Sequence, residues 1–350
     1  MPKQDAQIQR KVEHLFLAEK YFTAESFADF DSVRLLHDAL PEMKLSDVDL
    51  STNFLGKKMA LPIYFNAITG GSRQSTTFNT ELAQLAAKLD IPVSSGSMGV
   101  YLRLPEETRA SFTTLRENDP DGFVIANVSA KVNAAQAQQA IDLLHADALQ
   151  IHLNGLQELA MPEGDKEFFW LDNIKSIVAS VTVPVIVKEV GFGLSKNNLE
   201  QLLEAGVQHV DISGFGGTDF AQIESARNHE LDLTYLDQFS LSTVESLLES
   251  LPYQSKMTIL ASGGIRTPMD VIKALRMGAS SVGMSGLVLH HLQKYSLSET
   301  EKFFEDFVQQ LRLIMAAIGA KKIADIKKAP IIFDENLVNY AKQRKIILPS

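Results

Sequence analysis

Two glycine-containing tracts in the last third of the sequence have the composition of a phosphate-binding site. Residues 261–266 read Ala-Ser-Gly-Gly-Ile-Arg, and residues 283–286 read Gly-Met-Ser-Gly. Glycine allows backbone N–H groups to converge on phosphate oxygens, and the N-terminus of a following helix adds positive partial charge. Arg266 adds a full positive charge. Either tract alone is also typical of an ordinary turn, but the two together favour phosphate binding.

A single lysine, Lys188, interrupts the apolar run at residues 185–190. Burying an ammonium group without a partner is costly, so we expect Lys188 to point towards a bound anion. The alternative is an ion pair with the neighbouring Glu189. It is disfavoured because successive residues of a strand point to opposite faces.

The fourth expected strand and the loop after it concentrate amide, imidazole and carboxylate side chains. Strand alternation places Gln150, His152 and Asn154 on one face, with His152 towards the interior. A lone interior histidine is more often a satisfied core residue than a catalytic group, and both interpretations stay open. Gln157 and Glu158 follow in the loop, where a carboxylate can hold Mg²⁺ that also binds substrate phosphate oxygens. The alternative for Glu158 is a solvated loop charge.

Several further tracts offer small residues and neutral hydrogen-bonding groups. Residues 66–72 let a planar ligand lie against the backbone, and a threonine in this tract can donate to it. Residues 94–97 and 126–129 add serine, glycine and asparagine. Residues 211–218 are glycine-rich, but Asp219 stands where a GxGxxG dinucleotide fingerprint needs its third glycine. This last tract is therefore predicted to be a loop over a phosphate or cofactor.

Eight short apolar segments must position these groups. Most are continuous apolar runs, as expected for parallel strands that are buried on both faces. Segments with helical spacing separate them, such as residues 81–90, and Thr267-Pro268 followed by Asp270 predicts a capped helix start. Gly278 is the expected stop of that helix. The expected strands are residues 62–66, 91–95, 123–128, 148–153, 183–190, 209–213, 258–262 and 281–285.

Alternating strands and helices imply parallel pairing with right-handed crossovers. Eight units favour closure into an α/β fold of the (β/α)₈-barrel (TIM barrel) type, because closure leaves no exposed sheet edge. The alternative is an open doubly wound sheet. In such a barrel the ligand groups lie at the C-terminal ends of the strands, where all of the tracts above fall.

We expect one domain with three parts. These are an N-terminal extension at residues 1–60, the barrel core at residues 61–290 and a C-terminal helical segment at residues 291–350. Residues 214–257 are too long for a simple unit and are expected to hold an extra loop or helix. In the last part, Phe303, Phe304 and Phe307 are expected to pack on the barrel.

Composition excludes several classes of protein. The 350-residue chain has a formal net charge of -10, which argues against a nucleic-acid partner. It contains no cysteine, which excludes disulfides and cysteine-bound metals and fits a reducing compartment. Neither a secretory signal nor an apolar run of the roughly 18 residues that span a membrane is found. We therefore expect a cytoplasmic protein without a membrane partner.

With these residues assembled, the chain resembles the FMN-dependent type 2 isopentenyl-diphosphate isomerases. The shared motifs occur in the family's order. They are Arg-Lys-x-Glu-His at 10–14, Asn-Ala-Ile-Thr-Gly-Gly at 66–71, Ser-Gly-Ser at 95–97, Ala-Asn-Val at 126–128, and His-Leu-Asn, Gln-Glu and Met-Pro-Glu-Gly-Asp within 152–165. The last block is the most specific, because a generic flavin barrel does not need it.

The resemblance implies an enzyme that interconverts isopentenyl and dimethylallyl diphosphate by shifting a double bond. In the family, FMN must be reduced, usually by NADPH, and acts as acid and base, while Mg²⁺ assists. The resemblance also implies a homo-oligomer, because the family is commonly tetrameric or octameric.

Roles carried over from the family fall on matching positions of this chain. Arg10, Lys11 and His14 are implied to bind the substrate diphosphate, and Glu158 to bind Mg²⁺. Gln157 is implied to lie beside the reacting alkene, and His152 to line the substrate pocket. Residues implied to contact FMN are Ala67, Ile68, Thr69, Ser97, Asn127, Lys188, Ser213 and Thr218, and those implied to hold its phosphate are Gly263, Gly264, Ile265, Arg266, Ser285 and Gly286.

The physical demands of the reaction agree with these roles. Adding a proton to an unactivated alkene creates carbocation character, which needs a dry, electron-rich pocket. No strong side-chain acid is expected near the pocket, and this supports the flavin as the proton carrier. The chain also departs from the family: Met98-Gly99 replace a frequent Gln-Arg pair, Ile68 a common methionine and Ser285-Gly286 a frequent Ala-Leu pair.

Two alternatives remain. An FMN-dependent 2-hydroxy-acid oxidase shares this barrel type, but it needs a histidine base and a carboxylate-binding arginine near the flavin. Arg266 is the only arginine that we expect at the barrel mouth, and the phosphate already uses it. The second alternative is a non-catalytic barrel that binds a phosphorylated ligand as a sensor or scaffold.

Overall fold

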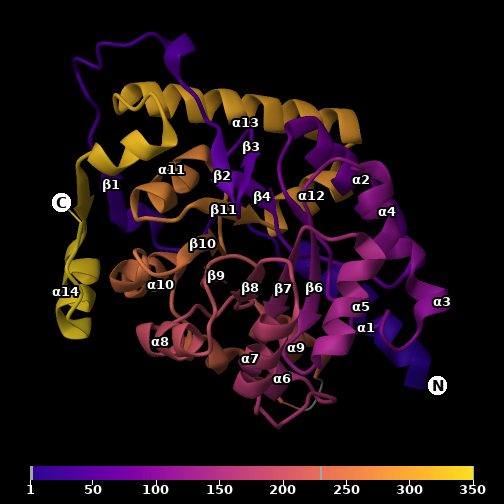
Figure 1. Cartoon of the computed structure of the whole chain (residues 1–350). Coiled ribbons are helices and arrows are strands. Elements are labelled where there is room, and N and C mark those ends of the chain that lie inside the picture. The colour runs from indigo at the N-terminus through magenta and orange to yellow at the C-terminus, as the bar shows by residue number, and fades with distance from the viewer. Residues whose placement is uncertain (1–2, 229–230, 350) are drawn as a thin grey trace.

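The computed structural model, which describes residues 3–228 and 231–349, contains a closed barrel of parallel strands (Figure 1). The strands pair in chain order, and the last closes on the first. Each overlaps a predicted segment, so the barrel, rather than the open sheet, is confirmed. The strands are β4 (Ile63–Phe65), β5 (Val93–Ser94), β6 (Val124–Ser129), β7 (Ala148–His152), β8 (Val185–Lys188), β9 (His209–Asp211), β10 (Thr258–Ser262) and β11 (Ser281–Met284).

Helices that follow the strands form the outer layer of the barrel. The hydroxyl of Thr267 accepts a hydrogen bond from the backbone N–H of Asp270 at the start of α11 (Pro268–Arg276), as predicted. Gly278 follows the end of this helix with a φ of 103°, which also agrees with the prediction. The other helices of this layer are α2 (Arg73–Leu89), α3 (Pro105–Thr108), α4 (Ala110–Asn118), α5 (Ala134–Leu144), α7 (Leu171–Ser180), α8 (Lys196–Glu204), α10 (Thr243–Ser250) and α12 (Gly286–Lys294).

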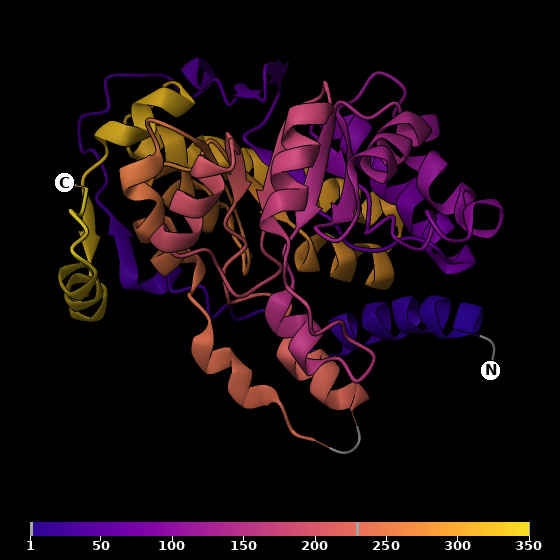
Figure 2. The same cartoon turned by 60° about the horizontal axis from the view of Figure 1, so that its bottom comes forward.

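Three helices gather at the end of the barrel where the strands finish (Figure 2). Helix α6 (Gly155–Ala160) follows β7, and α9 (Phe220–Arg227) follows β9 and packs against α6. The N-terminal helix α1 (Lys3–Lys20) lies beside α9 and α12. Together with the 3-10 helix η3 (Thr234–Phe239), α9 is the extra structure expected within residues 214–257.

The barrel interior is apolar at its opposite end. A hairpin of β2 (Thr52–Phe54) and β3 (Lys57–Met59) precedes the first barrel strand. Its buried side chains join those of the strands in one cluster, which closes this end to water and leaves the other end for ligands. The cluster consists of Phe54, Met59, Tyr64, Phe123, Ile125, Ala148, Ile186 and Leu260.

A short strand before the barrel pairs with a short strand after it on the outside of the barrel. Strand β1 (Val33–Leu35) pairs antiparallel with β12 (Ile331–Phe333), which is followed by α14 (Glu335–Arg344). Helix α13 (Leu297–Ala317) packs on α11 and buries Phe304 and Phe307, as predicted, while Phe303 is partly buried against the same core. Within residues 3–228 and 231–349, no helix combines the length and apolar character needed to cross a membrane.

We predict that Phe304→Ala lowers the free energy of unfolding by about 3–5 kcal/mol, because it empties a fully buried site whose ring lies 5.3 Å from that of Phe65. Chemical denaturation measures the change. The control is Leu313→Ala on the same helix, where the side chain is 52% exposed and the expected loss is within about 0.5 kcal/mol. Equal losses in the two variants would contradict the packing described for α13.

Candidate active site

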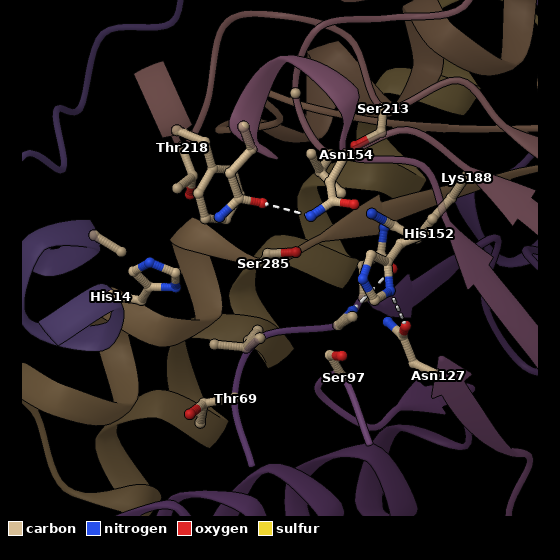
Figure 3. A pocket seen from close by; sticks show the side chains of 18 of the residues that line it. His14, Thr69, Ser97, Asn127, His152, Asn154, Lys188, Ser213, Thr218 and Ser285 are labelled. Carbon is tan, nitrogen blue, oxygen red and sulfur yellow. Dashed lines mark hydrogen bonds between the residues drawn. The ribbon is translucent and has the colours of Figure 1, made fainter. Parts of the chain in front are cut away.

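A cavity of about 1200 Å³ opens at the C-terminal ends of the barrel strands (Figure 3). The loops after all eight strands and helix α1 contribute to its wall. Every residue that the sequence assigned to a site lines this one cavity, although the assigned roles are separate predictions. These residues are Arg10, Lys11, His14, Ala67, Ile68, Thr69, Ser97, Asn127, His152, Gln157, Glu158, Lys188, Ser213, Thr218, Gly263, Gly264, Ile265, Arg266, Ser285 and Gly286.

One end of the cavity has the geometry of an oxyanion pocket. Gly263 and Gly264 have φ values of 102° and 68°, which favour glycine. Helix α12 begins at Gly286, where an added Cβ would lie 3.6 Å from Oγ1 of Thr218 and 3.9 Å from Nη1 of Arg266. A hydroxyl, a guanidinium and a helix N-terminus therefore converge on one small volume, as phosphate binding requires.

Arg266 is held in place by the segment that follows α1. Its Nε donates to the backbone oxygen of Thr23 at 3.0 Å, and its guanidinium carbon lies 4.7 Å from the centre of the Phe22 ring. Burial lowers the pKa of Arg266 to about 10, although Asp270 partly offsets this effect. The charge is thus costly without a bound anion.

Lys188 is buried at the floor of the cavity. Its Nζ donates to the backbone oxygen of Glu189 at 2.6 Å, whereas the Glu189 carboxylate accepts from the N–H groups of residues 190–192. The ammonium therefore bonds to a carbonyl and not to the neighbouring carboxylate, as the strand alternation predicted. Burial lowers the pKa of Lys188, and the charges of Asp211 and Glu189 oppose this shift.

His152 has a hydrogen-bond partner and also faces the cavity, so its catalytic use stays a prediction. Its Nδ1 lies 2.7 Å from Oδ1 of Asn127, and the ring also lines the cavity (Figure 3). Burial, and then the charges of Lys188, Lys11 and Lys131, lower the pKa of His152 to about 3. The imidazole is therefore neutral near pH 7.

Helix α1 brings a cluster of cations to the wall of the cavity. Arg10 and Lys11 lie on this helix, and Arg103 joins them from the turn after β5. Burial, then Arg10 and Arg103, lower the pKa of Lys11 to about 7. The nearest carboxylate to Arg10 is that of Glu163, with an Nη1–Oε1 distance of 3.6 Å. Cations that lower one another's pKa in this way have the chemistry suited to a multiply charged anion.

Glu224 on α9 connects His14 with Gln157. Its Oε1 lies 2.8 Å from Nε2 of His14 and accepts from Nε2 of Gln157 at 3.1 Å, while Oε2 accepts from Arg227. Burial raises the pKa of Glu224, but the contacts with His14, Arg227 and Gln157 outweigh this effect and hold the pKa below its usual value. The lowered pKa keeps this buried carboxylate ionised, so it orients Gln157 and is not a proton donor.

Glu158, the predicted Mg²⁺ ligand, is buried and already has several donors. Its carboxylate accepts from Nδ2 of Asn154 at 3.1 Å and from the backbone N–H of Asp165 at 2.7 Å, and it pairs with Lys131 at 3.0 Å. Among the residues that the structure describes, no group of three or more His, Cys, Asp or Glu side chains could hold a metal. A metal here needs oxygen ligands from a bound anion, which is how Mg²⁺ is often held.

Sequence reasoning missed four charged residues of the site and was wrong on one point. Arg103, Lys131, Glu224 and Arg227 come from loops and from α9, where nothing in the local pattern distinguishes them from surface charges. Arg266 is not the only arginine at the mouth, since Arg103 and Arg227 also line the cavity.

The structure also shows the surroundings of Met98-Gly99. Met98 is fully buried, and Arg103 donates to the backbone oxygen of Gly99 at 3.2 Å. Although Met98-Gly99 replace a frequent Gln-Arg pair of the family, Arg103 still places an arginine at this wall of the cavity.

The barrel fold and the comparison with known families define the class of protein. A family model described as FMN-dependent dehydrogenase matches residues 103–332. A mandelate oxidase variant covers 92% of this chain and 98% of its own, with a TM-score of 0.66 and 16% identity. A flavocytochrome b2 variant covers 96% of this chain and 86% of its own, with a TM-score of 0.68 and 18% identity. At these identities the two structures establish the fold alone.

Three named relatives identify the family of the chain within this class. A protein of Latilactobacillus sakei is 46% identical over 99% of both chains, and one of Lacticaseibacillus paracasei is 48% identical over 97% of this chain and 98% of its own. A Staphylococcus aureus protein is 42% identical over 97% of both chains. All three are named isopentenyl-diphosphate delta-isomerase. The chain belongs to the isopentenyl-diphosphate delta-isomerase family, within the FMN-dependent dehydrogenase class.

We predict that a bound diphosphate draws a proton onto Lys11. The pKa of Lys11 is lowered to about 7, so near pH 8 this side chain is mostly neutral until an anion raises its pKa. On binding inorganic diphosphate at about pH 8, the unsubstituted protein should take up about one proton more than Lys11→Met. Near pH 6 this difference should vanish, because Lys11 is already charged. Titration calorimetry in buffers of different ionisation enthalpy measures the uptake, and equal uptake by both proteins near pH 8 would contradict the assignment.

Proposed function

We propose that this protein interconverts isopentenyl and dimethylallyl diphosphate, with reduced FMN as its acid–base cofactor and with Mg²⁺. The observation that carries the proposal is a single cavity with two candidate anion sites. The pocket at Gly286 and Arg266 suits a phosphate, and the cluster of Arg10, Lys11 and Arg103 suits a diphosphate. His152 and Gln157 line the same cavity.

The residues at the first anion site fit FMN. In this proposal the phosphate lies at Gly263, Gly264, Ile265, Arg266, Ser285 and Gly286, where glycines with positive φ leave room for it. The ring system lies against Ala67, Ile68, Thr69, Ser97, Asn127, Lys188, Ser213 and Thr218. When bound, reduced FMN supplies an electron-rich face and a proton at its N5 edge. We propose that NADPH supplies the reducing equivalents.

The residues at the second anion site fit the substrate. Arg10 and Lys11 neutralise the diphosphate, and His14 lies behind them against Glu224. Gln157 is held by Glu224 and by Asn154, whose Nδ2 lies 3.4 Å from Oε1 of Gln157, so its uncharged amide keeps a fixed orientation. Such a group can lie beside a carbocation without capturing it.

Glu158 is the residue that we propose for Mg²⁺. One buried carboxylate with diphosphate oxygens and water can complete the ligand set of this ion. Lys131 pairs with both Glu158 and Asp165, so binding of the metal must displace this ammonium. We also propose a homo-oligomer, tetrameric or octameric, in the cytoplasm, on the strength of the family resemblance.

The decisive assay uses protein with dithionite-reduced FMN and Mg²⁺ under anaerobic conditions. We expect isopentenyl diphosphate to be converted to dimethylallyl diphosphate without net oxidation, and we expect the oxidised protein to be inactive. A 2-hydroxy-acid oxidase requires a histidine that accepts a proton at neutral pH, whereas the pKa of His152 is lowered to about 3. Oxygen-dependent turnover of a 2-hydroxy acid, with no double-bond shift, would replace our proposal with that function.

We predict that Glu158→Gln reduces turnover at limiting Mg²⁺ by at least about tenfold, a loss seen even for residues that only support a metal ligand. FMN content should stay unchanged, so the purified protein remains yellow. Activity should recover in part at high Mg²⁺. The control is Glu167→Gln, an exposed carboxylate in the same segment, which should leave the Mg²⁺ dependence unchanged. Unaltered Mg²⁺ dependence in Glu158→Gln would exclude this residue as the metal ligand.

A further inference from the structure

A chain of buried hydrogen bonds crosses the barrel beneath the cavity, from Asp211 to His152. Asp211 lies at the end of β9 and is fully buried, and it does not line the cavity. Three amides, those of Asn66, Gln150 and Asn127, connect it to the imidazole. Neither the proposed cofactor contacts nor the proposed substrate contacts use Asp211.

The carboxylate of Asp211 is surrounded by hydroxyl, amide and backbone N–H groups that donate to it. Tyr64 Oη and Asn66 Nδ2 both donate to Oδ2 at 2.6 Å. Ser262 Oγ and the backbone N–H of Ser213 donate to Oδ1 at 2.8 and 3.1 Å. Burial and the charge of Asp211 raise the pKa of Tyr64 well above its usual value, so the phenol keeps its proton. A carboxylate only accepts, and it therefore fixes which way each neighbour points.

The orientation of Asn66 follows from this carboxylate. Its Nδ2 faces Asp211, which leaves Oδ1 as an acceptor on the other side of the amide. That oxygen accepts from the backbone N–H of Ala67 at 2.8 Å and from Nε2 of Gln150 at 3.0 Å. A backbone N–H can only donate, so the Ala67 contact independently places an oxygen here.

The same logic carries the direction to the imidazole. Nε2 of Gln150 is used on Asn66, so its Oε1 accepts from Ser94 Oγ at 2.9 Å and from Asn127 Nδ2 at 3.2 Å. Oδ1 of Asn127 then faces Nδ1 of His152 at 2.7 Å. Because an amide oxygen only accepts, Nδ1 must carry the proton.

We propose that Asp211 acts through Asn66, Gln150 and Asn127 as a positioning residue that fixes His152 as its Nδ1–H tautomer. The other ring nitrogen, Nε2, then presents a lone pair to the cavity. It accepts a hydrogen bond from an N–H or O–H group of the bound cofactor or substrate. The catalytic use of this acceptor rests on the proposed function, whereas the tautomer itself does not.

The charges around His152 favour the same state. Burial, and then the charges of Lys188 on β8, Lys11 on α1 and Lys131 after β6, disfavour a second proton on the ring and outweigh the opposing contact with the backbone of Val128. A neutral ring whose Nδ1–H is already used cannot donate to a diphosphate oxygen. The diphosphate is therefore left to the cations on α1 and Arg103, and His152 selects a ligand group that carries a hydrogen.

Nitrogen NMR of histidine-labelled, FMN-loaded protein tests the proposal, because chemical shifts distinguish protonated from unprotonated ring nitrogens. The signals of His152 are identified by their loss in His152→Gln. At pH 7 we expect a protonated Nδ1 and an unprotonated Nε2. A protonated Nε2 in the unsubstituted protein overturns the proposal.

Variants test whether Asp211 is the origin of this state. Asp211→Asn and Gln150→Met should each allow Asn127 to turn, and the His152 signals should shift towards the Nε2–H form. Asn66→Ala interrupts the chain next to Asp211 and replaces Asp211→Asn if that variant does not fold. Tyr64→Phe removes one donor without changing any direction, so its tautomer should match that of the unsubstituted protein. An unchanged tautomer in Gln150→Met, or in the variant used at the Asp211 end, overturns the proposal.

This measurement is separate from the test of the proposed function. Ring-nitrogen shifts are recorded without turnover, so a protein with no isomerase activity still reports the tautomer of His152. Conversely, an active isomerase with the opposite tautomer rejects the positioning role of Asp211 and leaves the proposed function standing.

Discussion

The structure depends on hydrogen bonds within a layer of buried polar side chains inside the closed barrel. Below this layer the interior is apolar, and above it lies the cavity. Unpaired polar groups at this depth cost several kcal/mol each, so all must find partners. Asn66, Gln150, Asp211 and Ser262 come from four different strands or strand ends and bond to one another across the barrel axis. A slip of one residue in any strand would turn its polar group to the outer face. The network therefore sets register as well as chemistry.

The charged residues discussed below, which line the cavity above this layer, are positive, although the chain as a whole has a negative net charge. The formal charge is -10, yet Arg10, Lys11, Lys188 and Arg266 all face one cavity. The lowered pKa values of Lys11, Lys188 and Arg266 have a common first cause, which is burial without a sufficient counter-charge. A site of this kind is destabilised until anions enter it. The unfavourable burial of these cations would be offset by a bound anion, which is the basis on which we propose phosphorylated ligands for this cavity.

The barrel and the inner wall of the site could be predicted from the sequence, because both depend on short-range patterns. Continuous apolar runs marked the strands, and the Thr267 cap and Gly278 stop marked a helix. Glycines and Lys188 at strand ends then had to face the same mouth. Glu224 could not be found in this way. Its importance arises because His14 of α1 and Gln157 of α6 both contact it on α9. Each of these contacts joins segments more than 60 residues apart in the chain. Arg103 likewise gains its role only because α1 lies beside it.

Helix α1 is held over the mouth by two kinds of contact that act on different residues. Leu15 and Ala18 pack against the hydrophobic core, whereas Glu13 forms an ion pair with Arg227 of α9 and His14 contacts the carboxylate of Glu224. Arg227 joins Glu13, Glu163 and Glu224, which come from three separate segments. Glu224 is fully buried, so this junction is not a weak surface contact. One oxygen of Glu224 contacts both His14 and Gln157. Displacing α1 removes a partner from the oxygen that orients the Gln157 amide. The helix proposed to clamp the diphosphate and the amide proposed to face the alkene are therefore positioned by one carboxylate.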